Sequence, residues 1–219
     1  MDSAKPQKVF ILGGTGQCGR YTIQYALESG YEVTSLTRNP EKAPKHTGNF
    51  KWVKGNIYDK ASFVESMRGH DIVLSCVGSD GLGKTTIFTE GLKNVFEAME
   101  ETKINRIIFV GASFDHPDQG FFGRFFTTWV LKNIRRDYNA FDEWLAKYKG
   151  PVEWTCVKPF RLVEKGRTGK YHVAKNKSKT TPGWTFESSI PDVADFLIKE
   201  ITEKKWINQD LDIGFQKSR

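Results

Sequence analysis

Cysteine and histidine are scarce in this sequence, and their spacing excludes several classes of protein. The three cysteines, Cys18, Cys76 and Cys156, are isolated, and no CxxC pair occurs. The sequence therefore predicts neither a disulfide framework nor a zinc site, and it favours a reducing compartment. The four histidines lie far apart along the chain, so we expect no bound metal.

Long apolar runs are also missing. No segment approaches the roughly 20 apolar residues that a transmembrane helix needs. The first residues, MDSAKPQ, lack the apolar region of a signal peptide. From these absences we expect a cytoplasmic protein without a membrane partner.

The charge balance is basic but spread out. The formal net charge is +7 and the pI is about 9.2. The basic residues are scattered, and the run KNKSK at residues 175–179 is typical of a solvated loop. The sequence therefore does not favour a nucleic-acid partner, because such proteins gather their cations in a patch. A basic surface also attracts small anionic ligands.

Apolar runs of strand length alternate with helical patterns along the chain. We expect strands at residues 8–12, 31–36, 51–55, 71–77, 106–113 and 152–159. We expect helices at residues 17–29, 61–67, 88–99 and 131–148, and a last helix near Ser189. This alternation is typical of βαβ units. The predicted fold class is α/β, a Rossmann-type doubly wound parallel sheet in one domain over residues 1–219, and we expect a monomer.

Three local features interrupt or punctuate this pattern. An aromatic loop is expected at about residues 114–130, where FFGRFFTTW occurs, and a substrate-side segment at about residues 159–190. Ser189 with Asp192 resembles a capping box, and Pro191 falls in the first turn of the last helix.

A glycine-rich phrase follows the first expected strand and opens the first expected helix. Gly13, Gly16 and Gly19 in ILGGTGQCG form the pattern G-x-x-G-x-x-G. Glycine lets the backbone turn tightly and approach a pyrophosphate, which the free N–H groups of a helix N-terminus then bind. The strand, the spacing and the helix together predict a dinucleotide site.

A second phrase, VGSDGLGKTT at residues 77–86, contains the P-loop pattern G-x-x-x-x-G-K-T. It follows the fourth expected strand, and the next strand, RIIFVGAS, has no terminal acid to assist Mg²⁺. In a doubly wound sheet, the ends of the first and fourth strands face one crevice. We therefore expect Val77 and Gly78 to line the dinucleotide crevice, and the sequence leaves open whether Lys84 contributes charge to it.

The end of the second expected strand indicates which dinucleotide binds. NAD sites usually carry an acid there, which bonds the ribose 2′-hydroxyl. Here Arg38 stands in its place, and Lys42 follows one helical turn later. A guanidinium can grip a 2′-phosphate with two hydrogen bonds. The pattern favours NADP(H) over NAD(H).

At these residues the chain resembles the atypical short-chain dehydrogenases/reductases, and among them the NADPH-dependent flavin reductases of the biliverdin reductase B type. The matching segments are FILGGTGQCG, GYEVTSLTRNPEK, KGNIYD, HDIVLSCVG and TTIFTEGLKNVFEAM, in the same order. The resemblance is strong to about Ser113 and looser through GAS and VKPF.

The resemblance implies a role for each matching position. It implies that the pyrophosphate is bound by Gly13, Thr15, Gly16, Gln17 and Cys18. It implies that Arg38 and Lys42 bind the 2′-phosphate and that Asn56 and Ile57 border the adenine. It implies that the nicotinamide end is contacted by Val77, Gly78, Ser113, Pro159 and Phe160.

The chain also departs from this family. Asn56 stands where the family often has Asp, and the family's substrate-side histidines are replaced by Tyr138 and Phe160. The candidate catalytic residues are therefore Ser113 and Tyr138. Tyr138 also lies on the apolar face of its expected helix, where packing explains it equally well.

A Tyr-x-x-x-Lys proton donor, common in short-chain reductases, is not evident. Tyr138 is followed four residues later by Asp142, which would not lower the pKa of the phenol. YHVAK at residues 171–175 matches the pattern, but four residues along a strand span roughly 13 Å, so we treat the match as accidental.

Three hypotheses follow for function. The first is an NADPH-dependent reductase of a flat acceptor, either a flavin bound as substrate or a biliverdin-like tetrapyrrole. Reduction of such an acceptor needs no proton donor from the protein, because solvent can supply the proton. The second is a non-catalytic NADP-sensing regulator resembling NmrA-like proteins, which binds a protein through FFGRFFTTW. The third is a nucleotide triphosphatase.

Overall fold

A mostly parallel sheet forms the centre of the protein. The structure, a computed structural model, describes residues 7–114, 116, 120–178 and 185–215. Within these residues eight strands pair in the order β3-β2-β1-β4-β5-β6-β10-β8, with β8 antiparallel to β10. Their bounds are β1 (Lys8–Leu12), β2 (Glu32–Thr37), β3 (Phe50–Lys54), β4 (Ile72–Ser75), β5 (Arg106–Val110), β6 (Glu153–Pro159), β8 (Tyr171–Lys175) and β10 (Gln209–Phe215). The order 3-2-1-4-5-6 is that of the doubly wound Rossmann sheet, so the predicted fold class is confirmed.

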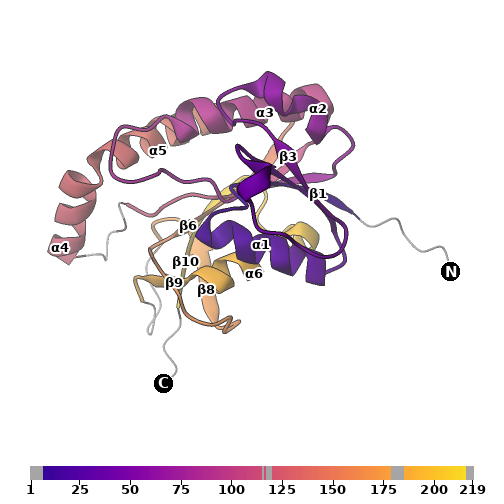
Figure 1. Cartoon of the computed structure of the whole chain (residues 1–219). Coiled ribbons are helices and arrows are strands. Elements are labelled where there is room, and N and C mark those ends of the chain that lie inside the picture. The colour runs from indigo at the N-terminus through magenta and orange to yellow at the C-terminus, as the bar shows by residue number, and fades with distance from the viewer. Residues whose placement is uncertain (1–6, 115, 117–119, 179–184, 216–219) are drawn as a thin grey trace.

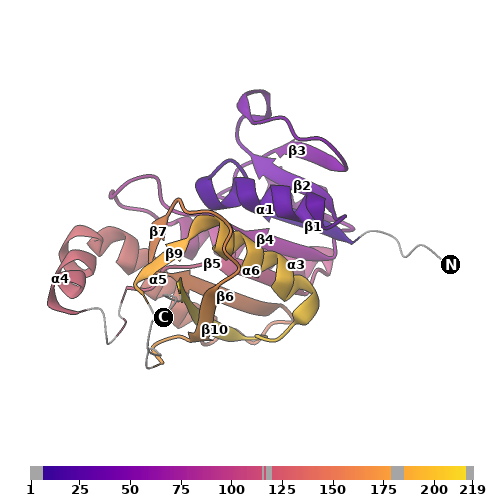
Figure 2. The ribbon, with the colours of Figure 1, turned by 90° about the horizontal axis from the view of Figure 1, so that it is seen from below.

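Helices cover both faces of the sheet (Figures 1 and 2), which explains why its central strands are continuous apolar runs. One face carries α1 (Gln17–Glu28) and α6 (Ile190–Glu203), which pack against each other. The other face carries α2 (Val64–Met67), α3 (Lys93–Thr102) and α5 (Lys132–Leu145). Two short helical segments precede helices on this face: η2 (Lys60–Ser62) precedes α2, and the π-helical η3 (Ile87–Leu92) precedes α3. A third, η1 (Pro40–Lys42), lies between β2 and β3.

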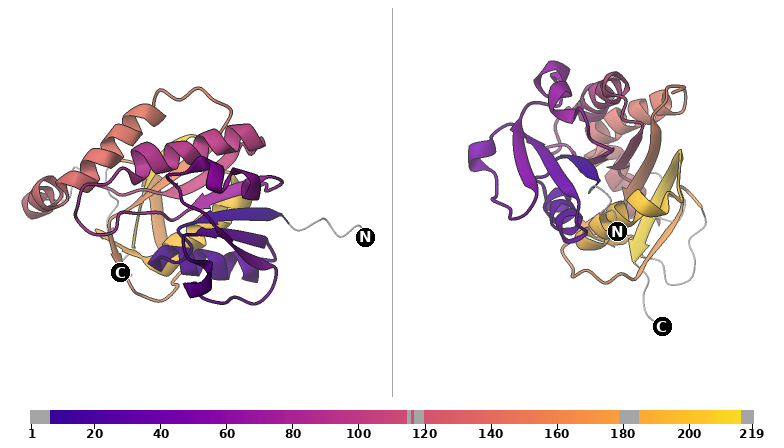
Figure 3. Two further views of the ribbon diagram at one scale, coloured as in Figure 1. Left: turned by 45° about the horizontal axis from the view of Figure 1, so that its top comes forward. Right: turned by 90° about the vertical axis from the view of Figure 1, so that its right-hand side faces the viewer.

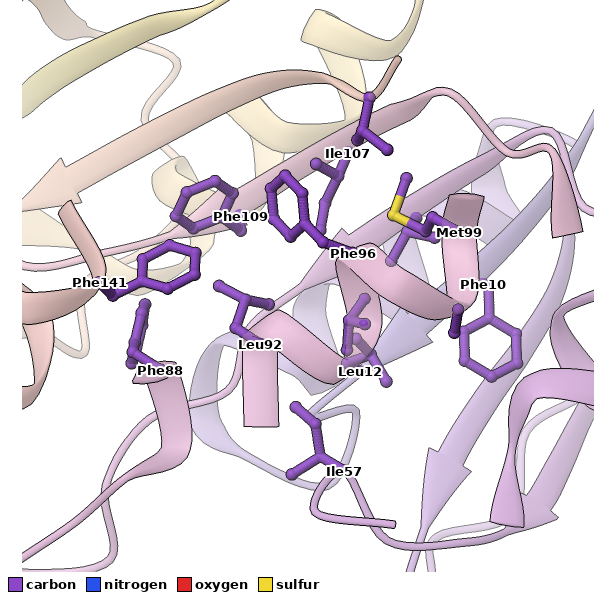
Figure 4. Packing of buried hydrophobic residues seen from close by; sticks show 14 of the residues in the cluster. Phe10, Leu12, Ile57, Phe88, Leu92, Phe96, Met99, Ile107, Phe109 and Phe141 are labelled. Carbon is purple, nitrogen blue, oxygen red and sulfur yellow. The ribbon is translucent and has the colours of Figure 1, made fainter. Parts of the chain in front are cut away.

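Aromatic rings fill the core beneath α3 and α5 (Figure 4). Phe96 on α3 is 1% exposed. Its ring meets the rings of Phe141, Trp144 and Tyr148 edge-on, at centroid distances of 6.1, 5.3 and 5.2 Å. Such pairs contribute about 0.5–1.5 kcal/mol each beyond the area they bury. The opposite face is built mainly from aliphatic side chains of the sheet, α1 and α6.

Buried ion pairs fasten elements to the sheet. Lys158 on β6 is 4% exposed, and its ammonium lies 2.7 Å from Asp142 of α5 and 3.2 Å from Asp210 of β10. Burial by itself would lower the pKa of Lys158. Cys156, Asp142 and Asp210 raise it by more than burial lowers it, so the net pKa is above the ordinary value and the side chain stays charged. These contacts fix the carboxyl end of β6, which precedes the predicted substrate-side segment.

The last helix begins where the sequence predicts, but not for the predicted reason. Ser189 is its N-cap residue and Pro191 lies in its first turn. The Ser189 hydroxyl donates to the Lys165 carbonyl rather than capping the helix, and Asp192 accepts N–H bonds from Thr168 and Gly169. The predicted capping box is therefore wrong: both side chains tether the loop that leads to β8.

Four of the described strands lie outside the six expected ranges, and of these only β8 covers a segment expected to be extended, the YHVAK match. β10 follows the last helix and joins the sheet beside β6, and β7 (Arg161–Val163) pairs with β9 (Glu187–Ser189) in a separate ribbon. Of these three strands, β7 and β9 lie within the predicted substrate-side segment. The predicted segment at residues 159–190 also includes residues 179–184, which lie outside the described part.

The predicted aromatic loop is wrong over its second half, which is helical. Residues 120–130 form α4 (Gly120–Phe125) and the π-helical turn η4 (Phe126–Val130), which leads into α5. Phe121, Phe125 and Trp129 recur every four residues and are 78%, 54% and 66% exposed. Figures 1 and 3 show α4 projecting away from the sheet and its covering helices. We call residues 120–130 the aromatic arm. Residues 115 and 117–119 lie outside the described part.

Among the described residues, none of the helices combines the length and apolar character needed to cross a membrane.

Replacing Phe96 with alanine should lower the free energy of unfolding by about 3–5 kcal/mol, because a buried ring and its edge-on contacts are lost together. Urea denaturation followed by circular dichroism measures this change. Phe121→Ala is the matched control, since that ring is 78% exposed, and it should change stability by less than about 0.5 kcal/mol. Equal losses for the two variants would contradict the assigned core.

Candidate functional site

The turn from β1 into α1 is shaped by glycines that have no room for a side chain. Gly13 has φ +73°, and a Cβ there would lie 2.8 Å from the backbone carbonyl carbon of Cys76. A Cβ on Gly19 would lie 2.1 Å from the Gly13 carbonyl oxygen. The turn closes with a 3.0 Å bond from the Gly16 N–H to the Gly13 carbonyl. These contacts bring the start of α1 against the ends of β1 and β4.

The first turn of α1 is suited to an anion. The helix begins at Gln17, and its first turn contains no acidic side chain. The first N–H groups of a helix have no partner within it, and its N-terminus carries a partial positive charge. A pyrophosphate placed at this turn would satisfy those donors.

A cavity of about 680 Å³ opens in front of this turn, along the carboxyl ends of β1, β2 and β4. Nine of the residues expected at the cofactor line it: Gly13, Thr15, Gly16, Arg38, Lys42, Asn56, Ile57, Val77 and Gly78. The volume falls within the range usual for ligand pockets. The structure thus brings segments from four parts of the sequence to one cleft.

The β2 end of the cleft carries two cations. Arg38 follows β2 directly, and Lys42 ends η1. An Nη atom of Arg38 lies 3.6 Å from a carboxylate oxygen of Asp80, with the two side chains 74% and 92% exposed. Exposed pairs of this kind are worth about 0–1 kcal/mol. A phosphate dianion can therefore replace Asp80 as the partner of Arg38 at little cost.

The wall next to these cations is held by its own hydrogen bonds. The Asn56 N–H donates to the Ser62 hydroxyl at 2.9 Å, and the Tyr58 N–H donates to the Asn56 side chain at 3.2 Å. The Ile57 carbonyl accepts a 3.1 Å bond from Asn94 of α3. The half-exposed ring of Tyr58 also lines the cavity, and the sequence analysis missed it. A tyrosine in a turn gives no periodic signal that could reveal such a position.

The segment with the P-loop pattern forms the opposite wall. Ser79, Asp80, Gly83, Lys84, Thr85 and Thr86 border the same cavity as the glycine turn. Lys84 is therefore at the cleft, which the sequence left open. The segment leads into the π-helical η3 rather than directly into a regular α-helix. The segment and the glycine turn therefore border one cavity, and the binding of a dinucleotide between them stays a prediction.

Six of the expected site residues are not among those lining this cavity in the described structure: Gln17, Cys18, Ser113, Tyr138, Pro159 and Phe160. Three of them meet at the ends of β5 and β6. The Ser113 N–H donates to the Pro159 carbonyl at 3.1 Å, and the Phe160 N–H donates to the Ser188 hydroxyl at 3.3 Å. The Ser113 hydroxyl is buried and has no hydrogen-bond partner among the described residues. Their roles at the nicotinamide stay predictions.

Tyr138 is a packing residue in this structure. Its ring lies 3.8 Å from that of Phe88 and 5.3 Å from that of Phe114, and the side chain is 7% exposed. Burial raises the pKa of the Tyr138 phenol well above its ordinary value. These surroundings favour packing over proton transfer, and a catalytic role for Tyr138 stays a prediction without a contact to the cleft.

The second tyrosine–lysine match is a strand, as expected. Tyr171 and Lys175 are the two ends of β8, and the Tyr171 hydroxyl donates to Asp195 of α6 at 2.9 Å. Burial and Asp195 raise the pKa of Tyr171. This pair therefore does not form a catalytic dyad.

Comparisons with known proteins agree with this geometry. The profile of a family described as NAD(P)H-binding matches residues 13–204. An isoflavone reductase homolog from Zea mays is 27% identical over 100 residues, covering 42% of this chain and 32% of that protein. Phenylcoumaran benzylic ether reductase TP7 from Nicotiana tabacum is 33% identical over 90 residues, covering 36% and 29%. The matched segment thus spans about a third of the length of these relatives.

Solved structures share the whole fold. A Rossmann-fold NAD(P)-binding family protein from Shigella flexneri superposes with a TM-score of 0.71 at 23% identity, covering 98% of both chains. A proposed NADH-flavin reductase from Streptococcus pneumoniae TIGR4 superposes with a TM-score of 0.77 at 19% identity, covering 96% of this chain and 100% of that one. At this identity the likeness concerns the fold alone. Because the family profile spans most of the chain, the chain belongs to the NAD(P)H-binding family.

Proposed function

We propose that this protein is an NADPH-dependent reductase that passes hydride to a flat conjugated acceptor, with flavins as the first class of acceptor. The observation that carries the proposal is the pairing of the glycine turn with Arg38 and Lys42 in one cleft. The turn suits a pyrophosphate, and the two cations suit the 2′-phosphate that distinguishes NADPH from NADH.

The acceptor class is inferred from the chemistry that the described residues offer. A ketone reductase needs a positioned acid, and neither Tyr138 nor Tyr171 in the described structure is free to serve as one. A reduced flavin spreads its charge over the ring, so solvent can protonate it. The chain then has to place the acceptor against the nicotinamide, which supplies the hydride when bound.

Ser113 is the residue we assign to orienting the nicotinamide end. Its backbone is tied to Pro159, while its buried hydroxyl has no partner among the described residues. A buried hydroxyl without a partner is costly, so a polar ligand group here would be stabilised.

The proposed NADH-flavin reductase and the plant reductases among the similar proteins support a reductase function for this chain. The resemblance to flavin reductases of the biliverdin reductase B type makes tetrapyrroles the second class of acceptor.

A non-catalytic NADP-sensing regulator is the alternative, and the aromatic arm favours it. Phe121, Phe125, Phe126 and Trp129 are each more than half exposed on a helix that projects from the body. Exposed apolar surface of this extent often marks a protein interface. In this alternative the cofactor state would control a partner rather than drive turnover.

Oxidation of NADPH in the presence of excess FMN, riboflavin or biliverdin tests the enzymatic proposal. We expect turnover with at least one flavin, because hydride transfer to such rings needs no acid from the protein. The Kd for NADPH is measured alongside. Tight binding of NADPH without turnover on any of these acceptors would refute the reductase and favour the regulator.

Arg38→Ala should weaken NADPH binding about tenfold or more while changing NADH binding less than about twofold, because charge-assisted hydrogen bonds contribute about 1.5–3 kcal/mol. Isothermal titration with both cofactors measures the difference. Arg68→Ala is the matched control, since Arg68 is an exposed arginine paired with Glu65 and does not line the cleft. Equal losses for NADPH and NADH would refute the 2′-phosphate role.

Alanine at the exposed rings of the aromatic arm distinguishes the two functions. If the arm offers stacking surface to the acceptor, removing Phe125 and Trp129 should raise the acceptor KM about two- to tenfold per ring and leave the Kd for NADPH unchanged. A loss of NADPH binding would make the arm structural. An unchanged KM would remove the arm from the reductase and leave it as a surface for a partner.

A further inference from the structure

Two of the three thiols lie together beside the glycine turn between β1 and α1. Cys18 is the second residue of α1, and Cys76 directly follows β4, where its N–H donates to the Leu12 carbonyl at 2.9 Å. The hydroxyl oxygen of Thr22, a fully buried residue one helical turn after Cys18, lies 3.3 Å from the Cys76 sulfur and 4.0 Å from the Cys18 sulfur. Both sulfurs therefore contact the same oxygen atom.

The two thiols differ in access to solvent. Cys76 is partly exposed and lines the cofactor cavity, whereas Cys18 is 7% exposed and lies behind it. Cys156, on β6, is 1% exposed and lies in the core beneath α3 and α5. A small reagent that enters the cleft thus meets Cys76 first, with Cys18 next to it.

The surroundings also make Cys76 the more reactive thiol. Contact with the Cys18 thiol and with the Thr22 hydroxyl lowers the pKa of Cys76, although burial opposes this shift. The Cys76 thiol and burial raise the pKa of Cys18 well above its ordinary value. Since the thiolate is the nucleophile, Cys76 is suited to attack and Cys18 to follow.

We propose that Cys76 and Cys18 form an oxidant-reactive thiol pair, a modification site in the wall of the cofactor cleft whose reagents are small hydroperoxides. The Cys76 thiolate attacks the peroxide oxygen, the O–O bond breaks, and the leaving alkoxide or hydroxide takes up a proton. The resulting sulfenic acid condenses with the Cys18 thiol, which releases water and forms a disulfide. The peroxide is reduced by two electrons, and the two thiols supply them.

The pair couples oxidation to cofactor binding. A disulfide needs its sulfurs about 2.05 Å apart, so its formation moves the first turn of α1 relative to the end of β4. The same two elements determine the position of the glycine turn, because Gly13 packs on the backbone of Cys76. Oxidation therefore weakens NADP(H) binding, and bound cofactor shields Cys76. This inference rests on the cofactor binding of the proposed function, but not on its acceptor.

The chemistry is tested on the wild-type chain with hydrogen peroxide or tert-butyl hydroperoxide. After alkylation of the remaining thiols and digestion without reductant, mass spectrometry should find the Cys18 and Cys76 peptides linked and Cys156 alkylated only after unfolding. In Cys18→Ser, Cys76 should instead be trapped by dimedone as a sulfenic acid. Absence of the linked peptide, or oxidation of Cys156 at the same rate, would overturn the proposal.

The coupling is tested by measuring NADPH affinity before oxidation, after it, and after re-reduction with dithiothreitol. We expect a loss of about tenfold or more, which corresponds to about 1.4 kcal/mol, and full recovery on reduction. Saturating NADP⁺ should slow the linkage to a similar extent. Equal affinities in the oxidised and reduced protein would refute the coupling. Failure of the reduced protein to bind NADPH at all would instead refute the cofactor assignment.

Discussion

The close approach of backbone to backbone at the β1–α1 turn is the constraint on which the site depends. At Gly13 and Gly19 an added methyl group would collide with main-chain atoms rather than with movable side chains. The turn therefore holds the end of β1, the first turn of α1 and the end of β4 in mutual contact. The phosphate-binding face of the helix, the cleft in front of it and the juxtaposition of Cys18 with Cys76 all follow from that contact.

Polar side chains are exposed at the β2 end of the cleft and buried beyond the ends of β5 and β6, outside the residues that line the cleft. Arg38 and Lys42 stand at the exposed β2 end, where an anion can replace Asp80 as a partner at little cost. Toward β5 and β6 the polar groups are buried, and Ser113 presents a hydroxyl without a partner among the described residues. Under the proposed function, the 2′-phosphate of the cofactor would meet the exposed cations, and its nicotinamide end would meet Ser113.

Local sequence was enough to predict the alternation of strands and helices and nine of the residues that line the cleft. Continuous apolar runs such as KVFIL form strands that are buried on both faces of a sheet. The spacing of the glycines marks positions where the backbone turn leaves no room for a side chain. Patterns that depend on distant partners were predicted less well. Ser189 and Asp192 match a local capping box, yet the loop at residues 165–169 takes both side chains instead.

The sequence by itself determined the fold class and the glycine turn with its basic neighbours, because these follow from periodicity and from backbone conformations that a few residue types allow. Tertiary structure alone decided which side chains share a space. It placed Lys84 and Tyr58 at the cleft, buried Tyr138 against Phe88, extended residues 120–130 as a helical arm, and brought Cys18 and Cys76 to one hydroxyl. The physical reason is that such contacts join residues remote in the chain, and no local pattern records the packing that brings them together.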